Sequence, residues 1–141
     1  MRVAAPILLL VLALGGCGGG GGEEKVGGTV PKCVDTVRYK DLSSQFPAEF
    51  PLPDGTVVGS EYKQSGARGA ELFIRGDLEA ARDYYKEQLP KHGFELGEGD
   101  AEEEEAETEF DGHGFEGHLK LRTIEGCANA LSLGVVLRPK S

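Results

Sequence analysis

The sequence contains no apolar run long enough to cross a membrane. Its longest run, Val3 to Leu14, is shorter than the roughly 20 residues that a membrane-spanning helix needs. Basic charge is also scarce: 15 lysines and arginines stand against 24 aspartates and glutamates, which gives a net charge of −9 at pH 7. Nucleic acids bind basic protein surfaces, and anionic lipid headgroups attract polybasic segments. The composition therefore argues against nucleic-acid partners and against membrane docking by charge.

Familiar catalytic motifs are missing as well. The chain has no Cys-x-x-Cys motif and no Gly-x-Ser-x-Gly nucleophile elbow. The glycine-rich stretch 112–118 lacks the lysine, the preceding strand and the following helix of a phosphate-binding loop. His113 and His118 are five residues apart on what reads as one strand, so they should point to opposite faces, and His92 follows a helix. These patterns predict no catalytic residues, no metal ligands and no cofactor, and hence a protein that is not an enzyme.

What the sequence does have is a distinctive start. Arg2 precedes the apolar run, which ends in Leu14-Gly15-Gly16-Cys17. A charged residue, a short apolar core and small residues before a cleavage point are typical of a secretory signal peptide. The last four residues resemble the lipobox of bacterial lipoproteins. An ordinary signal peptide followed by a chance cysteine is the alternative.

The lipobox resemblance implies that residues 1–16 are a signal peptide that is removed. It also implies a diacylglyceryl group on the sulfur of Cys17 and allows acylation of the new amino terminus. Two or more acyl chains hold a protein stably on a bilayer, whereas one chain holds it only marginally. We therefore expect an extracytoplasmic protein that is lipid-anchored to the cell membrane, with the membrane as its partner through the anchor.

Lipidation of Cys17 would leave two cysteines, Cys33 and Cys127. An even pair in an extracytoplasmic chain predicts a disulfide bond. A pair of free thiols and a cysteine-based active site are the alternatives.

The segment between the expected anchor and the domain has two parts. Residues 17–28 contain the lipidated cysteine and five consecutive glycines, which predict a flexible tether that holds the domain off the bilayer. Residues 29–53 carry Phe46, Phe50 and several prolines. Because the residue before a proline avoids the helical region, this stretch predicts an extended arm that packs its phenylalanines against the domain.

Residues 54–141 predict a single α+β domain. Asp77 can cap a helix over 78–89, and Gly93 supplies a left-handed exit from it. Alternation of apolar and polar residues predicts the strands, which we expect at 56–64, 69–75, from 94 onward, briefly at 108–111, and at 114–123 and 129–137. The element order predicts an antiparallel sheet of about five strands with one helix packed on one face (β-β-α-β-β-β).

The sheet face opposite the helix is expected to be partly apolar. The four residues placed on it are Val58, Tyr62, Phe73 and Val136. The N-terminal arm or a partner protein is expected to cover this face.

The helix and its surroundings resemble small bacterial envelope lipoproteins of uncharacterised function. The segments that carry the resemblance are Asp77 to Phe94, with its Tyr84-Tyr85 pair and Gly93-Phe94 ending, and the preceding Leu52-Pro53-Asp54-Gly55. The resemblance covers roughly residues 50–138 and brings no catalytic residues with it.

Residues 98–109 form an acidic run in which like charges repel, which predicts a solvated loop or a strand pair beside the core. Taken together, these features favour a membrane-tethered, non-catalytic binding or interaction module of the cell envelope, with an envelope protein or a small ligand as partner. One alternative is a cation-binding protein that uses the run 98–109, because carboxylates suit a hard cation. The other is a small envelope hydrolase that uses His113, His118 or buried carboxylates.

Overall fold

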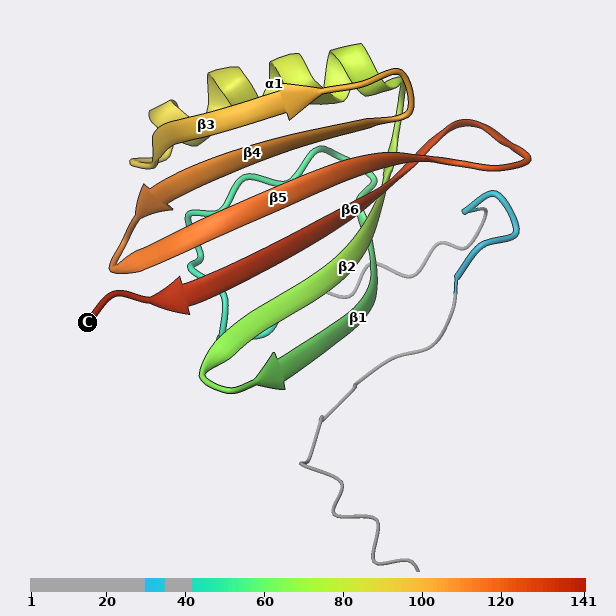
Figure 1. Cartoon of the computed structure of the whole chain (residues 1–141). Coiled ribbons are helices and arrows are strands. Elements are labelled where there is room, and N and C mark those ends of the chain that lie inside the picture. Colours follow the sequence, from blue (N-terminus) through green and yellow to red (C-terminus); the bar gives the residue numbers. More distant parts are fainter. Residues whose placement is uncertain (1–29, 35–41) are drawn as a thin grey trace, which may run out of the picture.

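The computed structural model describes residues 30–34 and 42–141 of the chain (Figure 1). The predicted signal peptide 1–16, Cys17 and the predicted tether 17–28 lie outside these residues, as do parts of the predicted arm 29–53. Within the described part, six strands and one helix follow one another in this order: β1 (Val57–Gln64), β2 (Ala67–Arg75), α1 (Leu78–Lys91), β3 (Glu95–Ala101), β4 (Glu105–Gly112), β5 (Phe115–Ile124) and β6 (Cys127–Pro139).

The strands form one sheet in the order β1-β2-β6-β5-β4-β3, and every neighbouring pair is antiparallel. The predicted antiparallel sheet with one helix on one face is confirmed, but the described residues form six strands instead of about five. The difference lies in the acidic run 98–109, which forms the end of β3, a turn and the first part of β4. A strand pair forms there because β4 lies next to basic side chains of β5.

Helix α1 packs over β3, β4 and β5 (Figure 1). Its cap is the predicted one, since Asp77 Oδ1 accepts a hydrogen bond from the backbone N–H of Ala80 at 2.8 Å. Its buried residues, which face the sheet, are Ala81, Tyr85 and Leu89. The helix continues to Lys91, two residues beyond the predicted end, because Pro90 fits into its last turn. Gly93 then leaves the helix with a φ of +84°.

The arm completes the layer on the helix side of the sheet. Phe46 and Phe50 are buried in the main core, which is the packing expected of the arm. The Phe50 ring lies 5.7 Å from the Phe110 ring, 6.0 Å from the Tyr85 ring and 6.1 Å from the Phe94 ring, measured between centroids. The arm therefore joins the helix to the sheet from the same side.

Val58 also packs against this main core. The placement of Val58 on the opposite face was therefore wrong. A register shift between Val58 and Ser60 interrupts the alternation of β1, so that it is Val57 that faces the other way, opposite Phe73.

A smaller apolar cluster lies on the side of the sheet away from the helix. It consists of the buried residues Val34, Val57, Phe73 and Ala130, with Val30, Ile124 and Cys127 packed against them. Residues 30–34 lie at the corner of the sheet next to the β5–β6 turn (Figure 1). The first described residues of the arm thus cover this corner, while its later part, with Phe46 and Phe50, packs on the helix side.

Candidate functional site: the open face of the sheet

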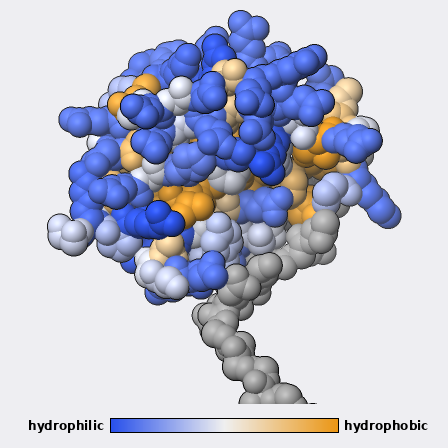
Figure 2. All heavy atoms as spheres, viewed as in Figure 1, coloured by the Kyte–Doolittle hydropathy of each residue, from blue (hydrophilic) through white to orange (hydrophobic). Residues whose placement is uncertain are grey.

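We call the side of β3, β4, β5 and β6 that faces away from α1 the open face. Leu119 and Leu121 of β5 point into the core, so the alternating residues His118, Lys120 and Arg122 point outward. Figure 2 shows this side of the molecule, which is mostly hydrophilic with a few apolar patches. The opposite side of the sheet, under the helix, is apolar and buried.

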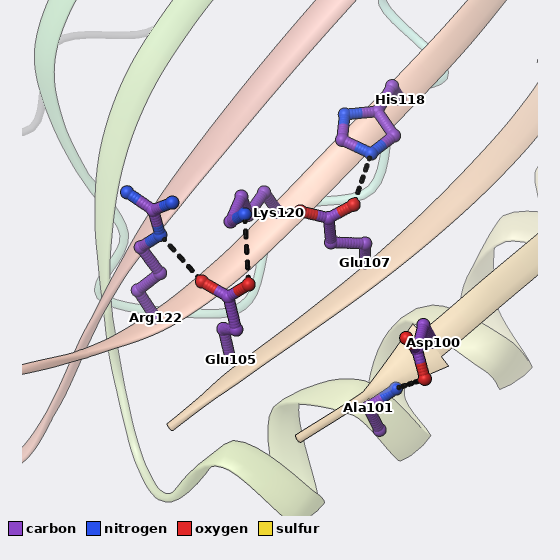
Figure 3. Close-up of polar contacts among 7 residues, drawn as sticks. All are labelled: Asp100, Ala101, Glu105, Glu107, His118, Lys120 and Arg122. Carbon is purple, nitrogen blue, oxygen red and sulfur yellow. Dashed lines mark hydrogen bonds and ion pairs between the residues drawn. The ribbon is translucent and has the colours of Figure 1, made fainter. Parts of the chain in front are cut away.

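Five outward side chains of β4 and β5 form a charge ladder: Glu105, Glu107, His118, Lys120 and Arg122 (Figure 3). Lys120 Nζ lies 3.1 Å from Glu105 Oε1 and also contacts Glu107. Arg122 Nε donates to Glu105 Oε2 at 3.1 Å, and His118 Nε2 lies 3.3 Å from Glu107 Oε2. The register explains the contacts, because Glu105 is paired with Arg122 and Glu107 with Lys120 across the two strands.

Lys120 and the two glutamates of the ladder hold one another in their charged forms. Hydrogen bonds from Lys120 lower the pKa of Glu105 and of Glu107, and the two carboxylates in turn raise the pKa of Lys120. A general acid or base works best when its pKa lies near the working pH. These shifts move the pKa values of Glu105, Glu107 and Lys120 further away from neutral pH. The ladder is therefore suited to holding charge and not to transferring protons.

Beside the ladder the open face is hollowed. This hollow has a volume of about 790 Å³ and lies between the start of β5 and the end of β6, reaching to β3 and β4. Its charged lining residues are Glu95, Glu109, Asp111, Glu116, Arg138 and Lys140. Lys140 pairs with Asp111, and their hydrogen bond raises the pKa of Lys140. Four carboxylates against two cations leave the hollow with a negative balance, while Val136 adds an apolar surface.

His113 and His118 do not come together. His113 lies in the β4–β5 turn, so its assignment to a strand was wrong; its φ of +52° and the following Gly114 turn the chain there. Its Nε2 atom donates to the carbonyl oxygen of His92 at 2.7 Å, and its ring packs on Phe94. His118 belongs to the charge ladder on the open face. The two residues that a hydrolase was expected to use therefore lie on opposite sides of the sheet.

The acidic run does not gather into one cluster. Residues 98–101 belong to the edge strand β3, and Glu105 and Glu107 are paired in the charge ladder. Among the residues that the structure describes, no three His, Cys, Asp or Glu side chains are grouped so that they could hold a metal ion.

Cys33 and Cys127 are both present in the described part of the chain, and their thiols are free. Cys33 Sγ donates to the backbone carbonyl of Gly126 at 3.2 Å. The disulfide between them remains a prediction. Cys17, the expected lipidation site, lies outside the described residues.

The charge ladder was missed at the level of sequence. The signal that could have found it is a match between two alternating patterns. Glutamates stand at 105, 107 and 109, and His118, Lys120 and Arg122 stand at every second position of the next strand. A tight turn between the two segments places these outward residues opposite one another.

Comparisons of the chain with protein-family models, with curated proteins and with solved structures find no match. Within residues 30–34 and 42–141, no helix is long and apolar enough to cross a bilayer.

Proposed function

We propose that this protein is a membrane-tethered bacterial lipoprotein that serves as a non-catalytic binding or interaction module of the cell envelope. The observation that carries the binding role is the hollow on the open face. The helix and the later part of the arm cover the other side of the sheet, and residues 30–34 cover a corner of the open face that does not include the hollow. The anchor is supported by the lipobox-like Leu14-Gly15-Gly16-Cys17.

The chemistry of the hollow indicates what it would bind. Its volume lies within the roughly 300–1,000 Å³ of ligand sites in proteins. The surplus of carboxylates favours a partner that offers cationic groups, either an envelope protein with a basic segment or a small cationic ligand. The neighbouring charge ladder fixes β4 against β5, so these carboxylates stand on a rigid support.

The anchor is tested by fractionating bacteria that express the full chain or its Cys17→Ala variant. We expect the wild type in the membrane fraction, with a diacylglyceryl mass on an N-terminal peptide that begins at Cys17. The variant should appear in the soluble extracytoplasmic fraction, and Cys33→Ala should stay with the membrane. A wild type that is soluble, or that carries an unmodified Cys17, would contradict the anchor.

The binding face is tested by photocrosslinking in intact cells. A benzophenone amino acid at position 136 lies in the hollow, whereas the same group at the exposed position 83 lies on the outer side of α1. We expect a discrete adduct from position 136 and none from position 83. Adducts of equal yield from both positions, or no adduct from position 136, would count against the open face as the binding surface.

A further inference from the structure

We infer that Cys33 and Cys127 form a disulfide that fixes residues 30–34 onto the corner of the sheet next to the β5–β6 turn. This inference does not depend on the proposed binding role. Cys33 Sγ donates to the carbonyl oxygen of Gly126 at 3.2 Å, although 93 residues separate them in the sequence. Gly126 directly precedes Cys127, and the two free thiols lie close enough for their side chains to interact, with no bond between them in this structure.

An apolar cluster next to the two cysteines holds this contact in place. Val34, the residue after Cys33, is only 4% exposed and belongs to the same apolar cluster as Val57 and Phe73. Cys127 packs against that cluster from β6. Cys33 itself is exposed, but the burial of Val34 and the packing of Cys127 against the same cluster keep the two cysteines near each other.

The backbone at this contact is held in an unusual conformation. Cys33 and Val34 have φ angles of +51° and +55°, in the left-handed region that residues other than glycine rarely adopt. A β-branched residue such as Val34 is especially disfavoured there. Such conformations persist only where the surroundings impose them. The burial of Val34 provides that constraint, and a covalent bond at Cys33 would reinforce it.

The thiol chemistry argues against a catalytic role for Cys33. The Cys127 side chain, through hydrogen bonding, raises the pKa of the Cys33 thiol, and burial and charge repulsion between the two sulfurs act in the same direction. A thiol with a raised pKa is mostly protonated at neutral pH and is a poor nucleophile, unlike the low-pKa thiolates of catalytic cysteines.

Formation of the bond requires an oxidant, which we assign to the disulfide of an envelope thiol–disulfide oxidoreductase. One thiolate attacks that disulfide to give a mixed disulfide, and the second cysteine then displaces the oxidoreductase sulfur. The Cys33–Cys127 bond forms, and the two protons and two electrons lost by the thiols leave the oxidoreductase as a dithiol. Because the thiolate is the attacking species, the reaction should accelerate as the pH rises.

The test is the thiol state of the exported full chain, trapped with acid and alkylated without reduction. We expect neither Cys33 nor Cys127 to be alkylated, a mass lower by two hydrogens than after reduction, and a Cys33–Cys127 crosslinked peptide. Cys33→Ser should leave Cys127 open to alkylation, and Cys127→Ser should do the same for Cys33. Alkylation of both cysteines in the unreduced wild type, or a bridge to Cys17 or to a second chain, would overturn the inference.

A second readout uses the wild type alone and so does not require the variants to fold. Lys32 lies inside the segment that the bond would fix. Tryptic cleavage after Lys32 should become several-fold faster when the protein is reduced, while the circular dichroism of the folded domain stays the same. Equal cleavage rates in the oxidised and reduced protein would show that the bond does not fix this segment.

Discussion

At the scale of single residues, Lys120 is the centre of the open face. Its side chain is only 25% exposed and contacts two carboxylates that would otherwise repel each other on the same strand. Arg122 and His118 add one contact each. Exposed ion pairs contribute little one by one, but a connected network of this kind holds its members in fixed positions.

Replacing Lys120 by methionine keeps the apolar stem and removes the charge. Glu105 and Glu107 then lose the hydrogen bonds that lower their pKa values. A carboxyl group with a lowered pKa stabilises the fold above its unfolded pKa, here near 4.5, and this contribution is lost as the pH falls through the folded value. We expect the variant to unfold at lower urea concentration than the wild type near neutral pH. The difference between the two urea midpoints should disappear below pH 4.5.

The matched control for this experiment is Lys86→Met, on the exposed surface of α1. It should show a small and pH-independent effect in urea unfolding followed by circular dichroism. The contradicting result is a difference in urea midpoint between Lys120→Met and the wild type that stays constant from about pH 7 to about pH 3. It would show that the contacts of Lys120 with Glu105 and Glu107 do not contribute to the pH dependence of stability.

At the scale of the elements, close contacts between aromatic rings and glycines on neighbouring strands shape the sheet. Gly117 of β5 is paired with Phe110 of β4, whose ring lies over the glycine. Gly69 of β2 is covered in the same way by Tyr62 of β1. Rings placed over glycines fill the space that a side chain would occupy and pin the register of the pair.

Gly117→Ala should therefore destabilise the protein. A Cβ atom at this position would lie 2.2 Å from two atoms of the Phe110 ring, which is 3% exposed and packs against Phe50 and Phe94. Because the ring has no room to move, we expect a loss of about 1–3 kcal/mol in the free energy of unfolding.

Gly134→Ala on β6 is the control for this substitution. The nearest atom to a Cβ there is the carbonyl oxygen of Lys120 at 4.0 Å, so alanine fits. We expect urea unfolding to show no loss of stability for this variant. If both variants lost similar free energy of unfolding, the loss would come from replacing a glycine in a strand and not from the contact with the Phe110 ring.

Local signals explain which elements could be predicted from the sequence. Asp77 and Gly93 mark the helix ends through their own backbone preferences, and the alternation of Leu119 and Leu121 with charged residues marks β5. The sequence left open whether the acidic run 98–109 is a loop or a strand pair, because its like charges look unable to pair when the run is considered alone. Its pairing depends on Lys120 and Arg122, which lie on another strand.

The sheet order depends on contacts that no local pattern encodes. β6, the last strand, lies between β2 and β5 in the middle of the sheet, so it joins the hairpin before the helix to the strands after it. The prediction of the side on which Val58 lies failed for a related reason, because it assumed regular alternation through the register shift in β1.

At the scale of the whole molecule, the two features that we assign to binding and to attachment lie at opposite ends of the central strands. The hollow lies where β5 begins and β6 ends, and residues 30–34 meet the sheet at the β5–β6 turn. The chain that leads back to Cys17 therefore enters the described structure away from the hollow. A partner could reach the hollow without displacing the start of the domain.

The most direct test of this account is the charge dependence of photocrosslinking from position 136 in membrane-anchored protein. The wild-type hollow should give a discrete adduct, and the double variant Glu109→Gln and Asp111→Asn should reduce its yield at least several-fold, because the carboxylates are what a cationic partner would recognise. The control Glu79→Gln, on the exposed first turn of α1, should leave the yield unchanged. An adduct that persists undiminished after both carboxylates are neutralised would contradict the proposal that the hollow binds a cationic partner.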